Sequence, residues 1–354
     1  MNIAIDISPL HSGNFLQHRV RGTGFYIENL KTSLEKYFPE NNYIYFIKGD
    51  KLQKNTDVIH YTYFEPFFLT LPLEKKHKKI VTVHDVTPLV FPIHFPPGIK
   101  GKIKWEIQKK ALKNSDIIIT DSSSSKRDII KYTGIKDEKI KVIYLAAKEN
   151  FVPLKNKNTK QEITKKYNIP SEFILYVGDI TWNKNVPRLI EAVNTIEIPL
   201  VIVGKALSDQ ELGKTDRKNL WNQDLFKVEQ LIKQNKEIFR LGFVPEEDLI
   251  KLYNSARVFL MPSLYEGFGL PVLEAMSCGC PVITSKDGSL EEVGGEAVFY
   301  VDAHNTNSIA SGVKEVFIDS KKQIELKKKG LVQAKKFSWK KTAEETIKVY
   351  EGTN

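Results

Sequence analysis

Short runs of apolar residues, each followed by a polar break and then by a helical pattern, recur through the first half of the chain. A short apolar run bounded by turn residues is typical of a buried strand, whereas apolar residues three and four positions apart indicate a helix. The runs predict strands at Asn2–Ile7, Tyr43–Ile47, Asp57–Tyr61, Ile80–Val83, Asp116–Thr120 and Ile140–Ile143. Because these strands alternate with helices, they indicate a mostly parallel sheet with helices on both faces.

The second half repeats this alternation. Strands are expected at Phe173–Val177, Pro199–Gly204, Phe239–Val244, Val258–Met261 and Pro281–Thr284, with a last helix at Lys335–Tyr350. A chain of 354 residues exceeds what one hydrophobic core usually supports, so two α/β domains are expected. The polar, lysine-rich segment Lys148–Lys160 is typical of a linker and places the boundary near Asn168, which gives domains at residues 1–168 and 169–335.

The stretch Pro262–Ser285 combines a bend with the start of a helix. It bends at Glu266–Gly269 (EGFG), where two glycines free the backbone. Pro271 suits a first helical turn, and Gly279 is placed to end the helix. A junction of this kind points unpaired N–H groups at the loop, so a phosphate or a sugar oxygen can bind there.

Glu266 and Glu274 flank this junction, one on the bend and one about a turn inside the helix. Carboxylates accept hydrogen bonds from hydroxyls, and two adjacent ribose hydroxyls can engage one carboxylate. The two glutamates could instead be a glycosidase pair, but the helical spacing separates them by roughly 12 Å, whereas a retaining hydrolase needs ~5 Å. Binding is therefore favoured over hydrolysis, and a pair of surface glutamates is the weaker alternative.

The net charge of +10 is unevenly shared. Residues 1–168 hold 29 Lys and Arg against 17 Asp and Glu, whereas residues 169–354 hold 24 against 26. The basic half suggests an anionic partner, such as a membrane surface, a phospholipid-linked substrate or nucleic acid. Solubility alone explains the excess of lysine nearly as well.

The cysteines and the first residues bear on the compartment. Cys278 and Cys280 are too few and too close for a disulfide framework or a complete zinc site, and they fit free thiols in a reducing cytoplasm. Met1–Ser8 alternates as a strand rather than forming a leader, and no apolar run approaches 18 residues. We therefore expect a cytoplasmic protein without a signal peptide or a spanning helix.

Polar and glycine residues follow several predicted strands. Gly22 and Gly24 stand at a strand–helix passage beside Arg19 and Arg21, where their amides can meet a diphosphate or a sugar. The alternative is a flexible turn.

His84 and Asp85 end a strand, which is where ligands of open α/β sheets bind. A histidine is more often a satisfied structural residue, but a polar pair at this place favours function. Lys184, in the loop after the strand Phe173–Val177, can supply a point charge to a diphosphate.

The segment Pro97–Asn114 predicts an amphipathic, basic helix around Trp105. Apolar residues recur at every fourth position: Ile99, Ile103, Ile107 and Ala111. Lysines surround them: Lys100, Lys102, Lys104, Lys109, Lys110 and Lys113. Such a helix can lie on an anionic membrane, but burial of the apolar stripe within its own domain is slightly preferred.

The serine run Ser122–Ser125 opens the next predicted helix. Ser125 with Asp128 fits a capping pattern. We therefore interpret the serines as turn and cap residues rather than as nucleophiles, since no base is assigned to them.

Two motifs carry a resemblance to a known family. EGFGLPVLEAM, from Glu266 to Met276, resembles the E-x7-E region of the retaining glycosyltransferases of family 4, and VHDVTPL, from Val83 to Leu89, is similar to their mannosyltransferase-like members. The resemblance spans nearly the whole chain. It implies the GT-B fold, with two Rossmann-like domains, a cleft between them, and a C-terminal helix at residues 336–354 that crosses back to the first domain.

The resemblance also implies a role for each candidate. Glu266, Lys184 and His84 form the catalytic set, in which Glu266 and His84 contact the donor sugar and Lys184 faces its diphosphate. In the donor-binding set the second glutamate holds the ribose, the glycine-rich amides line the sugar and diphosphate, and a later loop meets the base. That set comprises Gly22, Gly24, Asn185, Phe243, Val244, Gly267, Phe268, Gly269, Leu270 and Glu274.

The chain departs from the family in the loop around Lys184. The family commonly carries Arg-Lys-Asn in this loop or an arginine after the glycine. Those places hold Asn183 and Asp179 here, so one cation of the usual pair is missing. Arg188 or an arginine of the first domain would then compensate, and weaker stabilisation of the leaving group is the alternative.

The expected reaction is a retaining sugar transfer without a metal or other cofactor, because no Asp-x-Asp stands at a strand end with the other marks of a metal-dependent enzyme. GDP-mannose is the first choice of donor, and UDP- and dTDP-sugars stay open. The expected acceptor is a glycan or a polyprenyl-diphosphate-linked glycan at the inner face of an anionic membrane, in polysaccharide biosynthesis.

Other functions stay open. The chain could be a degenerate nucleotide-sugar-binding protein, or a GT-B epimerase or phosphorylase. A nucleic-acid-binding protein is less favoured, because the sequence has no recognition motif and its positive charge is spread over α/β elements.

Overall fold

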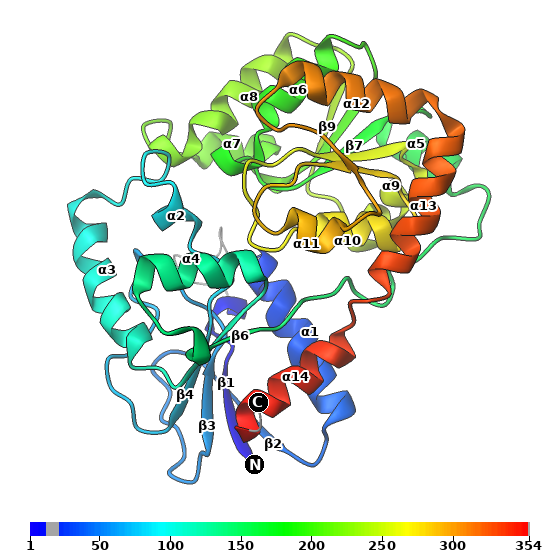
Figure 1. Cartoon of the computed structure of the whole chain (residues 1–354). Coiled ribbons are helices and arrows are strands. Elements are labelled where there is room, and N and C mark those ends of the chain that lie inside the picture. The colour runs from blue at the N-terminus through cyan, green and yellow to red at the C-terminus, as the bar shows by residue number, and fades with distance from the viewer. Residues whose placement is uncertain (12–20, 353–354) are drawn as a thin grey trace. The chain divides into compact units, whose positions relative to one another are not determined.

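The computed structural model describes residues 1–11 and 21–352 of the chain. The chain divides into two compact units, coloured along the sequence in Figure 1: Met1–Ala146 together with Phe337–Asn354, and Ala147–Lys336. Each unit has its own parallel sheet. Arg19, a candidate neighbour of the first glycine pair, lies outside the described residues.

The first unit is built on parallel strands in the order β2-β1-β3-β4-β5-β6. The strands are β1 (Asn2–Asp6), β2 (Asn42–Phe46), β3 (Val58–Tyr61), β4 (Lys78–Thr82), β5 (Ile117–Thr120) and β6 (Ile140–Val142). Each overlaps its predicted range. Ile80 and Val81 in the middle of β4 are fully buried, as expected for a parallel sheet covered by helices.

The helices of the first unit include one from the end of the chain. They are α1 (Arg21–Tyr37), α2 (Thr87–Val90), α3 (Gly98–Lys113), α4 (Ser123–Thr133) and α14 (Trp339–Glu351), with short 3₁₀ turns η1 (Ser8–Leu10) and η2 (Asp137–Lys139). α1 packs against α14, and α4 packs against β5 and β6. A buried cluster that includes Val81, Ile118 and Ile129 joins α4 to the sheet.

The second unit repeats the parallel arrangement in the order β12-β11-β10-β7-β8-β9. Its strands are β7 (Ile174–Val177), β8 (Leu200–Val203), β9 (Ile238–Gly242), β10 (Val258–Met261), β11 (Val282–Thr284) and β12 (Phe299–Tyr300). β7 and β10 are therefore neighbours, although β8 and β9 lie between them in the sequence. This adjacency positions the candidate site.

The helices of the second unit follow the strands in alternation. They are α5 (Thr159–Tyr167), α6 (Val186–Asn194), α7 (Asp209–Lys214), α8 (Gln223–Lys233), α9 (Glu246–Ser255), α10 (Leu270–Ser277), α11 (Leu290–Gly294), α12 (Thr306–Ile318) and α13 (Ser320–Ala334), with 3₁₀ turns η3 (Trp182–Lys184), η4 (Lys205–Leu207) and η5 (Leu220–Asn222). Within residues 1–11 and 21–352, no helix has the length and apolar character that crossing a membrane requires.

The first unit ends earlier in the chain than the sequence indicates. The expected boundary near Asn168 follows α5, but the structure divides the chain at Ala146/Ala147 and assigns α5 to the second unit. The reason is packing, because α5 lies against α9. Lys166 and Tyr167 at its end both donate hydrogen bonds to Asp248, each at 2.6 Å.

Three local expectations need correction. The cap of α4 is Ser122, whose hydroxyl accepts the Ser125 amide N–H at 3.0 Å, rather than Ser125 with Asp128. Gly22 and Gly24 lie inside the first turns of α1 rather than in a loop before it. Of the predicted stripe of α3, Ile99, Ile103 and Ile107 face outward, and only Ala111 is buried in its own unit.

The last helix, α14, is tied to the first unit by buried polar contacts. The Tyr350 hydroxyl lies 2.7 Å from Nδ1 of His60, whose Nε2 lies 2.7 Å from the Thr82 hydroxyl. Burial lowers the pKa of His60 to about 3, so the ring is neutral and uses one nitrogen as donor and one as acceptor. Thr342 also donates to the Tyr144 carbonyl at 2.7 Å.

Tyr350→Phe should lower the stability of the first unit by about 1–3 kcal/mol, because it leaves one nitrogen of the buried His60 without a partner. Urea unfolding of the purified variants measures the effect. Tyr45→Phe is the matched control, since it removes an exposed hydrogen bond to Glu35 and should change stability by less than about 0.5 kcal/mol. Equal effects of the two substitutions would contradict the structural role of the Tyr350–His60 contact.

Candidate active site

Two loops meet at the carboxyl edge of the second sheet. One follows β7 and carries Lys184 on the turn η3, and the other follows β10 and carries Glu266 before α10. β7 and β10 are adjacent and parallel, so their carboxyl ends lie at the same edge. This edge is where ligands bind in open α/β sheets.

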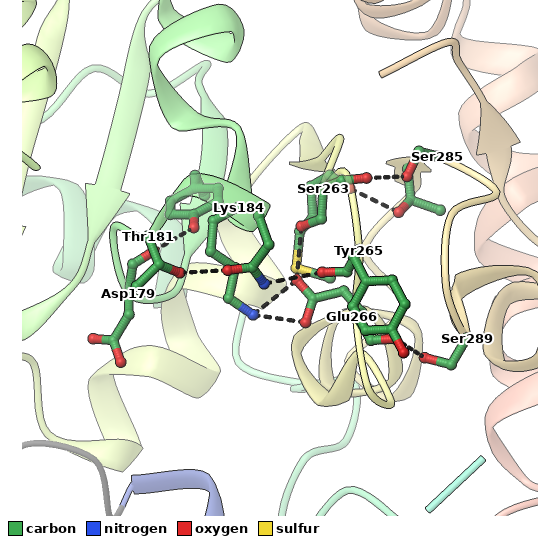
Figure 2. Close-up of polar contacts among 12 residues, drawn as sticks. Asp179, Thr181, Lys184, Ser263, Tyr265, Glu266, Ser285 and Ser289 are labelled. Atoms are coloured by element: carbon green, nitrogen blue, oxygen red, sulfur yellow. Dashed lines mark hydrogen bonds and ion pairs between the residues drawn. The ribbon is translucent and has the colours of Figure 1, made fainter. Parts of the chain in front are cut away.

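Lys184 and Glu266 form an ion pair at this edge (Figure 2). The Lys184 ammonium donates to both carboxylate oxygens of Glu266, at 2.8 and 2.6 Å. The Lys184 side chain is 22% exposed and that of Glu266 only 7% exposed. A partly exposed ammonium thus holds a buried carboxylate.

The Glu266 carboxylate and backbone are fixed from several sides. The Ser263 hydroxyl donates to the carboxylate at 2.7 Å, and the Ser289 hydroxyl and amide donate to the Glu266 carbonyl at 3.0 and 3.1 Å. Gly288 has φ +67°, and a Cβ there would lie 2.4 Å from the same carbonyl. Only glycine allows this close approach.

Asn183 joins the two loops through its side chain and its carbonyl group. Its amide donates to the Tyr265 carbonyl at 3.0 Å, its side-chain oxygen accepts from Thr181 at 2.8 Å, and its carbonyl accepts the Leu264 N–H at 2.7 Å. Asparagine can serve as donor and acceptor at once, which arginine cannot. Asn183 therefore builds the contact between the loops.

The other residues of this turn are committed to its structure. Asn185 has φ +58° and donates to the carbonyls of Pro262 and Ala303, at 3.0 and 2.7 Å. Arg188 donates to the Asn185 side chain at 2.6 Å and to the Ala303 carbonyl at 3.1 Å. Figure 2 shows Asp179 pointing away from the ion pair. In this geometry Arg188 supports the turn rather than extending as a second cation.

The glycine-rich segment leads from Glu266 into α10. Gly269 caps the helix with φ +93°, and a Cβ there would meet Leu290 at 2.8 Å. Pro271 lies in the first helical turn, as predicted, and Phe268 is buried. At the start of α10, Pro271 has no N–H and the Val272 N–H donates to the Gly269 carbonyl at 3.0 Å, so the Leu270 N–H is the amide of this turn that is placed to bind an anion.

Glu274 lies one turn further, inside α10. It is buried and accepts a hydrogen bond from the Tyr253 hydroxyl of α9 at 3.0 Å. Burial raises the pKa of Glu274 to about 7, and the Glu246 charge adds to the shift while Tyr253 opposes it. The carboxyl group therefore changes its protonation near neutral pH.

Phe243 and Val244 form the loop after β9. Gly242 at the end of the strand has φ +65°, which turns the chain toward α9. Val244 is buried, whereas the Phe243 side chain is 69% exposed. An exposed aromatic ring on this loop can stack on a nucleobase.

The remaining candidates belong to the first unit. His84 follows β4, and its Nδ1 lies 2.6 Å from Asp121, which follows the neighbouring strand β5. Burial alone would lower the pKa of His84, but the charge and hydrogen bond of Asp121 outweigh it, so the pKa is raised. The ring of Tyr26 lies edge-on to His84, with centroids 4.9 Å apart.

Asp85 and the glycine pair of α1 are the other candidates of the first unit. Asp85 accepts the Thr87 N–H at 2.8 Å, so it stabilises the turn into α2. A Cβ added to Gly22 of α1 would meet no atom within 4 Å, and Gly24 is buried.

Sequence reasoning missed several residues that hold the candidates. Ser263, Ser289 and Tyr253 orient the two glutamates, and Asp121 orients His84. Asp121 could have been found, because it ends a strand beside the one that His84 ends. The contacts of Ser289 and Tyr253 depend on tertiary packing that no sequence pattern shows.

Comparison with solved structures identifies the fold. The structure resembles sucrose-phosphate synthase from Thermosynechococcus elongatus with a TM-score of 0.76 at 18% identity, over 99% of this chain and 98% of that one. HepE from Anabaena, solved in complex with UDP-glucose, gives 0.72 at 16% identity over 99% of both chains. The protein has the GT-B fold, as predicted.

Family models then identify the family. Residues 159–333 match the model of glycosyl transferases group 1, and residues 15–147 match that of glycosyltransferase family 4. The chain belongs to the glycosyltransferase family that these two models describe. This confirms the resemblance to family 4 glycosyltransferases and the predicted enzyme class.

Two similar proteins come from Escherichia coli. O-antigen chain mannosyltransferase B is 30% identical over 308 residues, which are 83% of this chain and 75% of that protein. The serotype-specific mannosyltransferase WbdA is 29% identical over 287 residues, which are 79% of this chain. The match covers 34% of the length of WbdA.

Lys184→Met should lower the stability of the second unit by about 3 kcal/mol, because it leaves the buried Glu266 carboxylate without its cation. Adding Glu266→Gln should restore most of this loss, since no buried charge is then left. Denaturant unfolding of the single and double variants gives the coupling energy.

The control is the pair Lys286–Glu291 in the same unit, which is exposed on both sides. Lys286→Met should change stability by less than about 1 kcal/mol. A Lys184→Met variant as stable as the parent protein would show that the ion pair does not hold Glu266.

Proposed function

We propose that this glycosyltransferase moves a sugar, with retention of configuration, from a nucleotide diphosphate donor to a hydroxyl of a glycan acceptor in polysaccharide biosynthesis. The observation that carries the proposal is the Lys184–Glu266 ion pair beside the N-terminus of α10. A nucleotide sugar offers both groups a partner, because its diphosphate is anionic and its sugar hydroxyls are donors.

In the proposed complex, contacts with the donor replace the contact between Lys184 and Glu266. The diphosphate takes the Lys184 ammonium and the Leu270 amide at the start of α10, and the released Glu266 carboxylate accepts hydroxyls of the sugar. Ser263 keeps Glu266 oriented while this exchange occurs. Lys184 then stabilises the charge that develops on the leaving diphosphate.

The proposed chemistry is attack on the same face from which the nucleotide leaves. The bond between the anomeric carbon and the phosphate oxygen breaks, and a bond to the acceptor oxygen forms. The proton of the acceptor hydroxyl passes to the departing phosphate oxygen. His84, oriented by Asp121, contacts a hydroxyl of the donor sugar in this proposal. Lys184 and backbone amides provide the leaving-group stabilisation, and no metal ion takes part.

GDP-mannose is the proposed donor. The support is the similarity to O-antigen chain mannosyltransferase B, a protein named for mannosyl transfer. UDP- and dTDP-sugars are the competing donors, and the fold shared with HepE, which was solved with UDP-glucose, supports testing them. The exposed Phe243 ring is suited to any of these bases, because stacking is tolerant of base identity.

The proposed acceptor is a glycan linked to a polyprenyl diphosphate, and the protein would work peripherally at the inner face of the membrane. The support is the name of the mannosyltransferase relative, which concerns the O-antigen chain, and the excess of basic residues in the first half of the chain.

A second candidate function is nucleotide-sugar binding without transfer. It is favoured by the structural use of Asn183 and Arg188, which leaves Lys184 as the cation of the described turn that faces Glu266. Product analysis with labelled donor separates the two, since only a transferase forms a new glycoside.

Thermal unfolding with a panel of nucleotides and nucleotide sugars should show the largest stabilisation with GDP and GDP-mannose. A ligand at a hundredfold excess over its Kd adds about 2.7 kcal/mol. Lys184→Ala should lower the transfer rate by at least about a hundredfold, because charge stabilisation at the leaving group is lost. Glu266→Ala should lower it by a similar factor, because the sugar hydroxyls lose the carboxylate that orients them.

Lys286→Ala, an exposed lysine of the same unit, is the control and should keep full activity. Activity in the presence of a chelator is expected to be unchanged. Full activity in both Lys184→Ala and Glu266→Ala would refute the proposed site.

Affinity for GDP-mannose should rise about tenfold between pH 6 and pH 8, because Glu274 has a pKa of about 7 and only its ionised form can accept both ribose hydroxyls. Glu274→Gln should bind more weakly and show no such rise. Isothermal titration with the intact nucleotide sugar measures this, and Glu291→Gln should keep the parent profile. If the affinity of Glu274→Gln for GDP-mannose rose with pH as steeply as that of the parent protein, the ribose contact would be excluded.

A further inference from the structure

A pocket of about 180 Å³ lies in the second unit, next to the turn that carries Lys184. Its walls include Trp182 of η3, Arg188 and Glu191 of α6, Asp224 and Lys227 of α8, and Leu264 of the loop after β10. In Figure 1, α6 and α8 cover one face of the second sheet, whereas α9 and α10 cover the other. The pocket therefore lies on the face of the sheet opposite to α10.

Trp182 and Lys184 point to different sides of the turn η3. A 3₁₀-helix has about three residues per turn, so side chains two positions apart do not share a side. The Lys184 ammonium binds Glu266, whereas the partly buried Trp182 side chain lines the pocket. A large aromatic ring in the wall of a pocket gives a ligand an apolar face to pack on.

The charged side chains of the pocket balance one another. Arg188 and Lys227 are basic, and Glu191 and Asp224 are acidic. The Lys227 ammonium donates to Glu191 at 2.9 Å, and the two side chains are 54% and 41% exposed. An ion pair this exposed contributes little to stability, so both groups can bind a ligand at small cost to the fold.

Arg188 contributes further hydrogen-bond donors to the pocket. Its two hydrogen bonds, to the Asn185 side chain and to the Ala303 carbonyl, both come from Nη1. A guanidinium group has five N–H donors. Within the part of the chain that the structure describes, Nε and Nη2 of Arg188 make no hydrogen bond, so these nitrogens can donate to a ligand while Nη1 holds the turn.

This lining selects an uncharged ligand that is rich in hydroxyl groups. A phosphate would favour an excess of cations, which the balanced charges do not provide. An apolar chain would remove charged groups from water without giving them partners. The hydroxyls of a sugar both donate and accept hydrogen bonds, and its C–H face can pack on an aromatic ring. Because pockets for whole small ligands are larger, roughly 300–1,000 Å³, this one suits a single ring of a longer chain.

We propose that the pocket is a glycan-binding site that holds one sugar ring of the growing chain, away from the hydroxyl that reacts. The ring packs on Trp182, and its hydroxyls bind the charged groups of α6 and α8. Holding the chain there raises its effective concentration at the enzyme between transfers. The inference rests on the proposed function for the kind of glycan, which we take to be a mannose chain, but the pocket can bind sugar without a donor.

NMR titration of the full chain with α-linked mannotriose, in the absence of nucleotide, tests the pocket. The parent protein should bind the sugar saturably. Trp182→Ala should weaken binding at least about fivefold through loss of the aromatic face, and Trp182→Phe should stay within about twofold of the parent. Asp224→Ala/Lys227→Ala should weaken binding at least about tenfold, because two hydrogen-bonding groups are lost. Since it leaves η3 intact, this second variant should keep the parent's stabilisation by GDP-mannose.

Lys233→Ala is the matched control, because Lys233 lies on the same helix and pairs with Glu229 outside the pocket. It should bind mannotriose like the parent. No binding by the parent, or equal binding by the parent and the Asp224→Ala/Lys227→Ala variant, would overturn the proposal. Displacement of the sugar by GDP-mannose would also overturn it, since mannotriose would then occupy the donor site. Sugar binding that the pocket variants abolish, in a protein that forms no glycoside from any nucleotide sugar, would support the pocket and refute the proposed function.

Discussion

The second unit depends on keeping a nearly buried carboxylate charged next to a lysine that reaches the surface. A carboxylate in that position is costly unless a cation and hydrogen-bond donors surround it. The fold meets the requirement by making β7 and β10 neighbours, which brings Lys184 and Glu266 together across 82 positions of sequence. Ser263, Ser289 and the tight approach at Gly288 then leave the Glu266 loop little freedom.

Asn183 has a structural part in this site. An arginine there would reach toward an anion, whereas the shorter amide turns inward and links the two loops through Thr181 and Tyr265. Asn183 thus joins the turn that carries Lys184 to the loop that carries Glu266. Preorganised charge is effective in catalysis because it does not have to rearrange as the reaction proceeds.

Much of this could be predicted from the sequence. The strands and the Glu266–Ser277 junction were located correctly, because apolar runs, glycines and Pro271 act locally. The order of the strands could not be predicted, since β7 and β10 become neighbours only when the sheet assembles. The orientation of α3 was predicted incorrectly for a related reason. The helix has two apolar sides, and the contacts of Gln108 with a distant segment decide which one faces inward.

The position of α14 has a consequence for biosynthesis. The first unit is discontinuous in the sequence, because it needs Phe337–Asn354 in addition to Met1–Ala146, whereas the second unit is one continuous segment. During translation the second unit is complete while His60 still lacks Tyr350. The unit whose synthesis begins first therefore completes its packing only when α14 has been made, after the whole of the second unit.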